Sequence, residues 1–389
     1  MDAALARLLT SSQALALLDA MPPYTRDGAE RIGRELRAGG VAPELVAAVL
    51  TQSRLRADAG VKFGDFAAGM LFTQDGLEQA TRLAVAARHA QRYRAAGITE
   101  IADLTCGIGA DAMAAAALGL EVSAFEIDEA TALIADHNLR HWDHARVVLA
   151  DALDVVPNLD VGGIFADPAR RGARGRRHDP RDYSPALDAV LALRGRTPAL
   201  GVKVGPAIPH EAVPEDAEAE WVSIDGTVVE AGLWCGPLTE EPGHAALVLD
   251  AAGAHRIAGS TRRAEVSDLT DYVFEPDGAV IRAGLVGELA QRLGAGTLDP
   301  SIAYLAAPAP TMTPFARGYR VVEAMPFKTK ALASALRARG IGTVDIKKRG
   351  VDVTPEQLRP QLRLTGDERA TVILTRVAGR RMALLAEPL

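Results

Sequence analysis

The sequence contains few cysteines, few aromatic residues and no long apolar run. Two cysteines, Cys106 and Cys235, among 389 residues exclude a disulfide framework and a cysteine-rich zinc site. The longest apolar stretch, Ala112–Leu120, is far shorter than the roughly 20 residues that a membrane-spanning helix needs. The first residues, Met1-Asp2-Ala3, do not resemble the start of a signal peptide. We therefore expect a cytoplasmic protein with no membrane anchor.

An excess of positive charge is also absent. The net charge is −7, which argues against a protein that coats nucleic acid non-specifically. The charge is unevenly distributed, however, because the chain from Arg262 onward holds 19 basic and 14 acidic residues. This placement predicts that different parts of the chain meet different partners, and drift between domains is the alternative.

The length of the chain fits two or three domains, and the apolar pattern predicts three. Residues 1–94 are predicted to form an N-terminal helical domain. Residues 95–258 show short apolar runs that alternate with helix-like segments, a pattern typical of a parallel sheet covered on both faces. A turn-rich segment, Gly259–Arg263, is the predicted linker, and residues 264–389 repeat the α/β pattern in a smaller domain. The predicted fold class is α/β.

Two segments near the end of the larger α/β domain carry further expectations. The runs Thr227–Cys235 and His244–Leu249 resemble an antiparallel strand pair at one edge of the sheet. The segment Glu211–Glu220 is rich in carboxylates and resembles an ordinary solvated surface stretch.

A glycine-rich turn follows the first predicted strand. The strand carries Asp103, turns through Gly107 and Gly109, and enters a helix over Ala112–Leu118. Glycines let the backbone approach a ligand closely, and a helix N-terminus offers free N–H groups. Gly107, Gly109 and Ala112 also fit the dinucleotide pattern G-x-G-x-x-G/A, so the turn alone permits NAD as well as another nucleotide.

Acidic residues follow the next three predicted strands. Glu126 ends the second strand, where a carboxylate accepts hydrogen bonds from ribose hydroxyls in both NAD and S-adenosylmethionine sites. Asp151 follows the third strand and can hold an adenine amino group. The fourth strand ends in Asp167-Pro168. A methyltransferase acting on an amino group needs such an acid-proline pair, and an oxidoreductase does not.

Together these segments resemble a known family. Asp-Leu-Thr-Cys-Gly-Ile-Gly-Ala-Asp, Phe-Glu-Ile-Asp-Glu, Ala-Asp-Ala and Asp-Pro-Ala-Arg resemble the four core motifs of class I S-adenosylmethionine-dependent methyltransferases over about residues 98–250. Within that class the chain is most similar to bacterial RNA methyltransferases that carry Asp-Pro-Ala-Arg-Arg and a C-terminal THUMP-like domain. The resemblance implies a Rossmann-like catalytic sheet, S-adenosyl-L-methionine as cofactor, and a C-terminal domain of the kind that presents tRNA or rRNA.

The resemblance also implies a set of cofactor-binding residues. Asp103, Gly107 and Gly109 surround the methionine part of the cofactor, and Ile127 packs on the adenine. A segment before the glycine turn resembles one that closes over the cofactor, and it contributes Gln79 and Thr81. The predicted cofactor site comprises Gln79, Thr81, Asp103, Thr105, Cys106, Gly107, Gly109, Asp111, Glu126, Ile127, Asp151 and Ala152.

The fourth motif implies the catalytic residues, which are Asp167, Pro168, Ala169 and Arg170. In amino-methylating enzymes the acidic residue and the carbonyl after it accept hydrogen bonds from the target amine and orient its lone pair. This chain departs from the common Asp-Pro-Pro-Tyr version, because Arg170 stands where an aromatic side chain would stack on the base. Phe165 or Tyr183 could supply that ring instead.

A basic segment follows the fourth motif directly. Residues 170–181 contain six arginines in twelve residues, with glycines between them. Such a loop beside an active site can neutralise nucleic-acid phosphates. The alternatives are a solvated loop and a loop held by Asp179 and Asp182. The predicted RNA-binding residues are Arg171, Arg174, Arg176, Arg177 and Arg181. The clusters Arg317–Arg320 and Lys347–Gly350 are weaker candidates for RNA contact.

Three histidines have the spacing of metal ligands. His137, His141 and His144 could lie on one face of a helix. They fall between the second and third strands, away from the expected crevice, so we interpret them as a partly exposed helix end. No metal is predicted.

The sequence therefore predicts an S-adenosylmethionine-dependent methyltransferase that acts on an exocyclic base nitrogen of rRNA or tRNA. A methyltransferase of the same fold that acts on a small molecule or a protein is the second hypothesis. An NAD-type oxidoreductase or a non-catalytic nucleotide-binding module is the third. Neither the particular RNA nor the oligomeric state follows from the sequence.

Overall fold

The structure is a computed structural model, and it describes residues 1–156, 159–169, 171–172, 175–176 and 182–389. The chain forms two compact units. The first comprises Met1–Val204 and Leu233–Glu240, and the second comprises Gly205–Gly232 and Glu241–Leu389. The division into three domains with boundaries near residues 94 and 260 stays a prediction. Within the described residues, no helix is long and apolar enough to cross a membrane.

The first unit begins with helices and continues with alternating strands and helices. Its helices are α1 (Ala3–Leu9), α2 (Ser12–Asp19), α3 (Arg26–Ala38), α4 (Pro43–Phe63), η1 (Gly64–Gly69), α5 (Gln74–Gln79), α6 (Leu83–Ala95), α7 (Ala110–Ala117), α8 (Glu129–Leu139), α9 (Ala152–Val155), α10 (Leu187–Ala192) and η4 (Leu193–Gly195). Its strands are β1 (Glu100–Asp103), β2 (Glu121–Glu126), β3 (Ala145–Leu149), β4 (Gly163–Ala166), the short pair β5 (Arg171–Gly172) and β6 (Gly175–Arg176), and β7 (Leu200–Val204).

Side-chain caps and prolines explain where several of these helices start. Ser11, Thr73 and Asp128 each accept a hydrogen bond from a backbone N–H in the first turn of α2, α5 and α8. Pro43 occupies the first turn of α4, because that position needs no backbone N–H donor.

Five strands of the first unit, in the order β3-β2-β1-β4-β7, form a parallel sheet. Their register pairs Asp103 with both Ala124 and Phe165, and pairs Glu126 with Leu149. The carboxyl ends of the strands therefore meet at one edge. Strands β4 and β7 are buried throughout, which explains their continuous apolar sequences.

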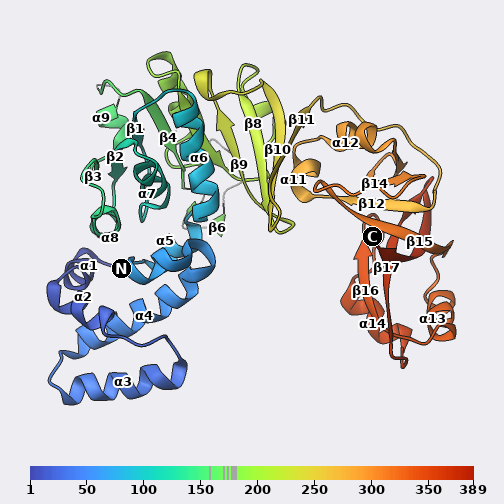
Figure 1. Ribbon diagram of the computed structural model, residues 1–389, viewed down its shortest axis with the longest axis horizontal. Helices are drawn as coiled ribbons and strands as arrows, with labels where there is room; N and C mark the ends of the chain where they lie inside the picture. The colour runs from blue at the N-terminus through green and yellow to red at the C-terminus, as the bar shows by residue number, and fades with distance from the viewer. Residues whose placement is uncertain (157–158, 170, 173–174, 177–181) are drawn as a thin grey trace. The chain divides into compact units, whose positions relative to one another are not determined.

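Helix α6 packs against this sheet through Tyr93. The Tyr93 hydroxyl donates a hydrogen bond of 2.6 Å to the carbonyl of Ile164 in β4. Glycines in the strands leave room for the ring, since a Cβ at Gly163 would lie 2.8 Å from it and one at Gly201 would lie 2.5 Å from its hydroxyl. Figure 1 shows α6 running along the sheet, with α1–α4, in blue, grouped beyond one end of the strands.

Two buried amide side chains join the N-terminal helices to the rest of the first unit. Asn138 of α8 accepts from the N–H of Leu71 at 2.8 Å and donates to the carbonyls of Leu71 and Ile108. Gln52 of α4 bonds both backbone groups of Phe72 in the same manner. Because these groups are buried, the pairs fix the segment before α5 against the turn between β1 and α7.

The second unit contains further strands and helices, among them those of a separate sheet. Its elements are η5 (His210–Ala212), β8 (Glu218–Ile224), β9 (Thr227–Trp234), β10 (Gly243–Asp250), β11 (Gly253–Gly259), β12 (Tyr272–Pro276), α11 (Gly278–Arg282), α12 (Val286–Leu293), β13 (Gly296–Asp299), β14 (Ile302–Ala307), β15 (Ala316–Pro326), α13 (Thr329–Ala338), β16 (Ile341–Lys348), α14 (Pro355–Leu362), β17 (Glu368–Val377) and β18 (Arg380–Pro388). The last residues of β9, with η6 (Gly236–Leu238), belong to the first unit. The full order of the larger sheet is β11-β10-β8-β9-β7-β4-β1-β2-β3.

Two sequence expectations about this region are wrong. Strands β9 and β10 are not neighbours, since β8 lies between them and β10 pairs antiparallel with β11. The segment predicted as solvated, Glu211–Glu220, ends inside β8, where Glu218 is fully buried and Glu220 is 5% exposed. Arg256 of β11 donates to both carboxylates, at 2.9 and 3.2 Å, and this pairing makes their burial tolerable.

The second sheet has the order β13-β14-β12-β15-β18-β17-β16. Helices α13 and α14 pack on one face through Leu332, Leu336 and Leu358, which contact the apolar side chains of β16–β18. The helical N-terminus, the parallel sheet with additional edge strands and the smaller C-terminal α/β region confirm the predicted fold class.

Candidate functional site

Four acidic residues lie at or just beyond the carboxyl ends of successive strands in the first unit. Asp103 ends β1 and is 1% exposed, and Glu126 ends β2 and is half-buried. Asp151 follows β3, where its side chain caps α9, and Asp167 follows β4 with a side chain 26% exposed. Because the strands are parallel and in register, the sheet brings these predicted site residues to one edge, where open α/β sheets bind ligands.

The turn between β1 and α7 has the conformation that its glycines allow. Gly107 and Gly109 have φ values of +55° and +90°, a region that side chains disfavour. The N–H of Gly107 points at Glu126 and donates to its Oε2 at 3.1 Å. Gly109 caps α7 without a side-chain hydrogen bond, so backbone N–H groups at this helix end remain available to a ligand.

Asp103 is the least satisfied polar group at this edge. Its Oδ1 accepts a hydrogen bond of 3.2 Å from the N–H of Thr105, while its buried Oδ2 has no hydrogen-bond partner among the described residues. Burial, followed by the nearby charge of Asp111, raises the pKa of Asp103 well above its ordinary value. A cationic ligand group placed here would donate a hydrogen bond to Oδ2 and relieve the repulsion between the carboxylates.

The second and third strand ends combine a carboxylate with exposed apolar side chains. Ile127, directly after Glu126, is 70% exposed, and Leu149 at the end of β3 is 53% exposed. Burial raises the pKa of Glu126, although the N–H groups of Asp128 and Gly107 oppose that shift. An adenosine fits this combination, because the carboxylate can accept from ribose hydroxyls while the apolar side chains cover the base.

These observations fit S-adenosylmethionine, which carries an ammonium, a sulfonium and an adenosine. Asp103 and the glycine turn would hold its methionine part, and Glu126, Ile127 and Asp151 its adenosine part. A dinucleotide fits less well, because its pyrophosphate would lie among carboxylates. Cys106 and Ala152, also among the predicted cofactor residues, are buried.

Thr81 and Asp111 belong to a buried polar network that the sequence did not reveal. Asp111 Oδ1 lies 2.8 Å from His89 Nδ1, and its Oδ2 accepts from the Thr81 hydroxyl at 2.6 Å. The Thr81 hydroxyl in turn accepts from Lys203 Nζ at 2.9 Å. Burial favours a higher pKa for Asp111, but the hydrogen bond and charge of His89, together with Lys203, outweigh it and lower that pKa.

Lys203 extends the network to the fourth motif. Its Nζ lies 2.6 Å from Asp167 Oδ2 and 3.5 Å from the carbonyl oxygen of Gln79. The only sequence signal for Lys203 is that a lysine interrupts the apolar strand Leu-Gly-Val-Lys-Val. Nothing in the spacing of the motifs connects it with Asp167.

A second lysine holds the segment before the glycine turn. Lys62 of α4 donates to the carbonyls of Leu77, Glu78 and Ala80 at 2.7–2.8 Å, where α5 ends. Burial, followed by the charge of Lys203, lowers the pKa of Lys62 to about 8. The predicted cofactor-closing segment is thus bound on one side by Lys62 and on the other by Lys203.

The structure describes three of the four predicted catalytic residues, Asp167, Pro168 and Ala169. The N–H of Asp167 donates to the Thr105 hydroxyl at 2.7 Å, Pro168 is buried, and Ala169 forms an isolated bridge with Ser184. Arg170 lies outside the described residues. Neither Phe165 nor Tyr183 presents an exposed ring, because they are 3% and 6% exposed.

Three of the five predicted RNA-binding arginines, Arg174, Arg177 and Arg181, lie outside the described residues. The backbones of Arg171 and Arg176 are paired in the β5–β6 ladder.

Two of the three histidines lie beside backbone carbonyls. His137 is buried, not partly exposed as predicted, and its Nε2 lies 3.2 Å from the carbonyl oxygen of Gly69. Burial lowers the pKa of His137 to about 4. His144, which is exposed, lies 3.0 Å from the carbonyl oxygen of Ala116.

In the second unit, the basic clusters singled out from the sequence are largely engaged within the protein. The ring of Tyr319 is buried, and Arg320 pairs with Glu387. Lys347 and Arg349 both face Glu275. These contacts leave Tyr319 unable to stack on a base.

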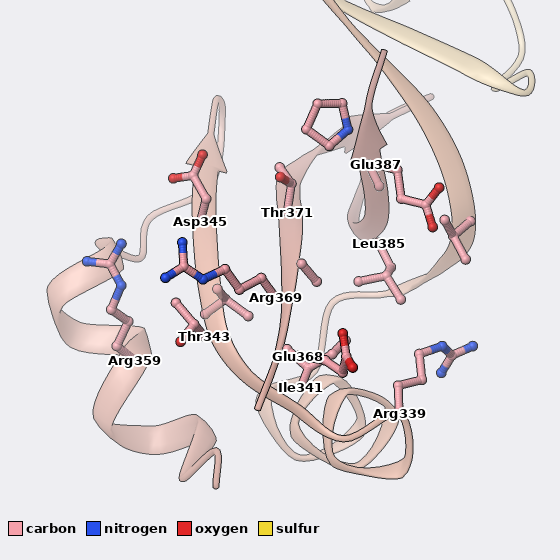
Figure 2. Close-up of a pocket in the computed structure, with 15 residues that line it drawn as sticks. Arg339, Ile341, Thr343, Asp345, Arg359, Glu368, Arg369, Thr371, Leu385 and Glu387 are labelled. Carbon is pink, nitrogen blue, oxygen red and sulfur yellow. The ribbon is translucent and has the colours of Figure 1, made fainter. Parts of the chain in front are cut away.

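A cavity of about 780 Å³ lies on the second sheet, lined by residues of β15–β18, α14 and the end of α13. Figure 2 shows the side chains of Arg359, from α14, and Arg369, from β17, extending toward one another near Asp345. Within the described part of the chain, neither guanidinium forms a hydrogen bond or an ion pair. These two arginines, which the sequence did not single out, are therefore better placed for an external anion than the predicted clusters.

Comparison with known proteins gives three findings. A model of the THUMP domain-like family matches residues 316–388. An uncharacterised S-adenosylmethionine-dependent methyltransferase of Mycobacterium tuberculosis, present in strains CDC 1551 / Oshkosh and ATCC 25618 / H37Rv, is 35% identical over 352 residues, which are 88% of this chain and 94% of the relative. A crystal structure described as that of a methyltransferase from Porphyromonas gingivalis W83 shares the fold, with a TM-score of 0.74, 21% identity, and coverage of 94% of this chain and 100% of that one.

Proposed function

The chain belongs to the S-adenosylmethionine-dependent methyltransferases, and from that premise we propose that it methylates an exocyclic base nitrogen in rRNA or tRNA. The observation that carries this proposal is the position of Asp167. Its carboxylate follows β4 directly, is partly exposed, and precedes a buried proline at the edge of the sheet where Asp103 and Glu126 also lie. An acidic residue there suits an amine as the methyl acceptor.

When bound, S-adenosylmethionine supplies a methyl group on a sulfonium and leaves as S-adenosylhomocysteine. The protein's own contribution is to position the amine and to exclude water. The Asp167 carboxylate accepts a hydrogen bond from the target amine, which directs the nitrogen lone pair toward the methyl group. The same carboxylate stabilises the positive charge that develops on that nitrogen.

An RNA substrate is supported by the C-terminal region and by charge placement. Residues 316–388 match the THUMP domain-like family, and the resemblance seen in the sequence implies a domain of the kind that presents tRNA or rRNA. We further propose that the arginines of residues 170–181, and Arg359 and Arg369 at the cavity of the second unit, contact RNA phosphates. A small-molecule or protein substrate requires neither group of arginines, so we prefer RNA as the substrate.

The proposed function is tested with Asp167→Ala. We expect this change to reduce methyl transfer by at least about 100-fold, because the target amine loses its orienting acceptor. The affinity for S-adenosylmethionine, measured by calorimetry, should stay within a few-fold, since β1 separates β4 from the strands β2 and β3 whose ends are predicted to bind the adenosine. The matched control is Asp160→Ala, which removes an exposed aspartate before β4 and should leave activity unchanged.

The target is identified by mass-spectrometric mapping of modified nucleosides in rRNA and tRNA from cells that lack the protein. We expect one methylated base to disappear, to return with the wild-type chain, and to stay absent with Asp167→Ala. Restoration of the modification by Asp167→Ala would contradict the proposed role of this residue. An unchanged set of RNA modifications would favour the small-molecule or protein alternative.

A further inference from the structure

Lys203 is a buried lysine at the edge of the sheet, between the residue proposed to orient the target amine and the segment before the glycine turn. Its side chain is 5% exposed. Its Nζ contacts Asp167 Oδ2 at 2.6 Å, the Thr81 hydroxyl at 2.9 Å and the carbonyl of Gln79 at 3.5 Å. The ammonium therefore has acceptors from two separate segments of the chain, the end of β4 and the segment before the glycine turn.

The sheet register explains how Lys203 reaches Asp167. Strands β4 and β7 are parallel neighbours, and their last registered pair is Ala166 with Val202. Asp167 and Lys203 are the next residues on the two strands, so their side chains meet where the strands end. A buried ammonium is costly unless it is paired, and an apolar residue would suit the rest of β7 better. The position thus keeps a charge where stability alone does not require one.

Lys203 and Thr105 hold Asp167 at two points. The Thr105 hydroxyl accepts from the backbone N–H of Asp167 at 2.7 Å, and Lys203 binds the carboxylate itself. A carboxylate that orients an amine needs a fixed direction, because small misplacements of a positioning group cause large losses of rate. The ammonium also favours the ionised carboxylate, which accepts hydrogen bonds and donates none.

The same ammonium is connected to the cofactor side of the site. Thr81, which accepts from Lys203, donates to Asp111 in the first turn of α7, and Asp111 pairs with His89 of α6. This buried chain of contacts joins the fourth motif to the helix that follows the glycine turn. A shift of α7 would therefore alter the position of Lys203 and, through Lys203, the position of the Asp167 carboxylate.

We propose that Lys203 is a positioning residue for methyl transfer: it fixes the Asp167 carboxylate toward the target amine and ties it to the Thr81–Asp111 pair beside the cofactor turn. This inference rests on the proposed role of Asp167. It assigns to Lys203 an effect on the rate of transfer, not on cofactor binding or on folding.

The test is Lys203→Met in the full chain, with transfer of labelled methyl groups from S-adenosylmethionine to bulk rRNA and tRNA from cells lacking the protein. We expect apparent kcat to fall about 10- to 100-fold, while the apparent KM for RNA and the Kd for S-adenosylmethionine change by less than about threefold. Val202→Ala is the matched control, because it opens a cavity in the same buried strand without touching Asp167. It should lower the Tm and leave kcat unchanged.

Two results would overturn the proposal. One is an unchanged kcat for Lys203→Met while Asp167→Ala is inactive, which leaves the proposed function intact and removes Lys203 from it. The other is a lower kcat that comes with a comparable loss of affinity for the cofactor and with a lower Tm. That result would show that Lys203 has a structural role alone.

A double variant shows whether Lys203 acts through Asp167. Asp167→Asn removes the charge that Lys203 binds. Adding Lys203→Met to it should therefore lower kcat by less than a further factor of about three. Losses that multiply in the double variant would show that Lys203 acts independently of Asp167 and would contradict the inference.

Discussion

At the scale of single residues, the Asp103 carboxylate is the group best suited to bind a cationic part of a ligand. Its Oδ2 is buried and lacks a hydrogen-bond partner in the described part of the chain, and burial together with Asp111 raises its pKa well above the ordinary 3.8. Between the ordinary pKa and the raised one, the folded protein holds a proton that the unfolded chain has lost. The contribution of Asp103 to stability therefore falls as the pH rises through that window.

A proton should leave the protein when S-adenosylmethionine binds, because its ammonium favours the ionised form of Asp103. We expect calorimetric titrations in two buffers of different ionisation enthalpy to show release of up to about one proton per cofactor bound, at a pH between the two pKa values. Asp103→Asn should abolish that release and weaken binding. The same change should raise the Tm of the unliganded protein, increasingly so as the pH rises through the window.

Asp154→Asn is the control for this prediction, since Asp154 is an exposed acid on α9. Its proton release should match that of the wild type. Identical proton release from Asp103→Asn and the wild-type chain would show that another group titrates on binding.

The residues of the candidate site differ in how far the sequence could predict them. Asp103, Glu126 and Asp167 lie at or just beyond the ends of apolar strands, and strand ends can be found from local patterns. Lys203 could not be assigned in this way, because it lies 36 residues from Asp167 and 122 from Thr81, and only the fold brings them together. A buried ion pair has no local signature beyond a charged residue in an apolar strand.

At the scale of elements, the packing of α5 against the glycine turn controls the shape of the cofactor site. A Cβ at Gly76 of α5 would lie 2.4 Å from Ile108 Cγ2, and Ile108 stands between Gly107 and Gly109. The Cγ2 atom is bound to the Cβ of Ile108 and cannot move far by itself. Any side chain at residue 76 therefore displaces the turn or the helix.

Gly76→Ala should destabilise the protein and weaken S-adenosylmethionine binding. The overlap costs about 1–3 kcal/mol, which exceeds the gain of up to about 1 kcal/mol from replacing a helical glycine. The measurements are thermal unfolding and calorimetry with the cofactor. Gly60→Ala in α4 is the matched control, because a Cβ there meets nothing within 4 Å and should raise the Tm. Equal changes in Tm and in cofactor affinity for the two variants would show that the glycine turn tolerates movement.

Elements were predicted well where their pattern is local and poorly where burial depends on distant partners. The apolar strands β1, β2 and β4 were identified because both faces of the sheet are covered. Strand β8 was missed because Glu218 and Glu220 resemble surface residues, and their partner Arg256 is 38 and 36 residues away. Helices α11 and α12 are separate elements because Gly284, with φ of +73°, lies between them.

At the scale of the whole molecule, the placement of charge is more informative than its sum. The chain carries −7 overall, yet four of its acidic residues, Asp103, Glu126, Asp151 and Asp167, lie at the strand ends that fit a cationic cofactor. In the second unit, Arg320 and Arg349 pair with carboxylates, whereas Arg359 and Arg369 form no ion pair within the described ranges. An RNA-binding role thus depends on a few cations and not on a basic surface.

Salt dependence should reveal which arginines meet RNA phosphates. We expect Arg359→Ala with Arg369→Ala to weaken binding of bulk tRNA and to reduce the slope of log K against log salt by about one for each phosphate contact removed. The same reasoning predicts a smaller slope when Arg174, Arg176 and Arg177 are replaced with alanine. Fluorescence anisotropy over a range of salt concentrations measures both.

Arg320→Ala is the control, because that side chain is exposed but already paired with Glu387. Its slope should equal that of the wild type, since no counterions are released at a cation that the protein neutralises itself. If Arg320→Ala reduces the slope as much as the cavity variants do, binding follows net charge and the cavity has no special part in it. If only the variants of residues 174–177 reduce the slope, RNA contact belongs to the segment after the fourth motif, and the cavity arginines are solvated side chains.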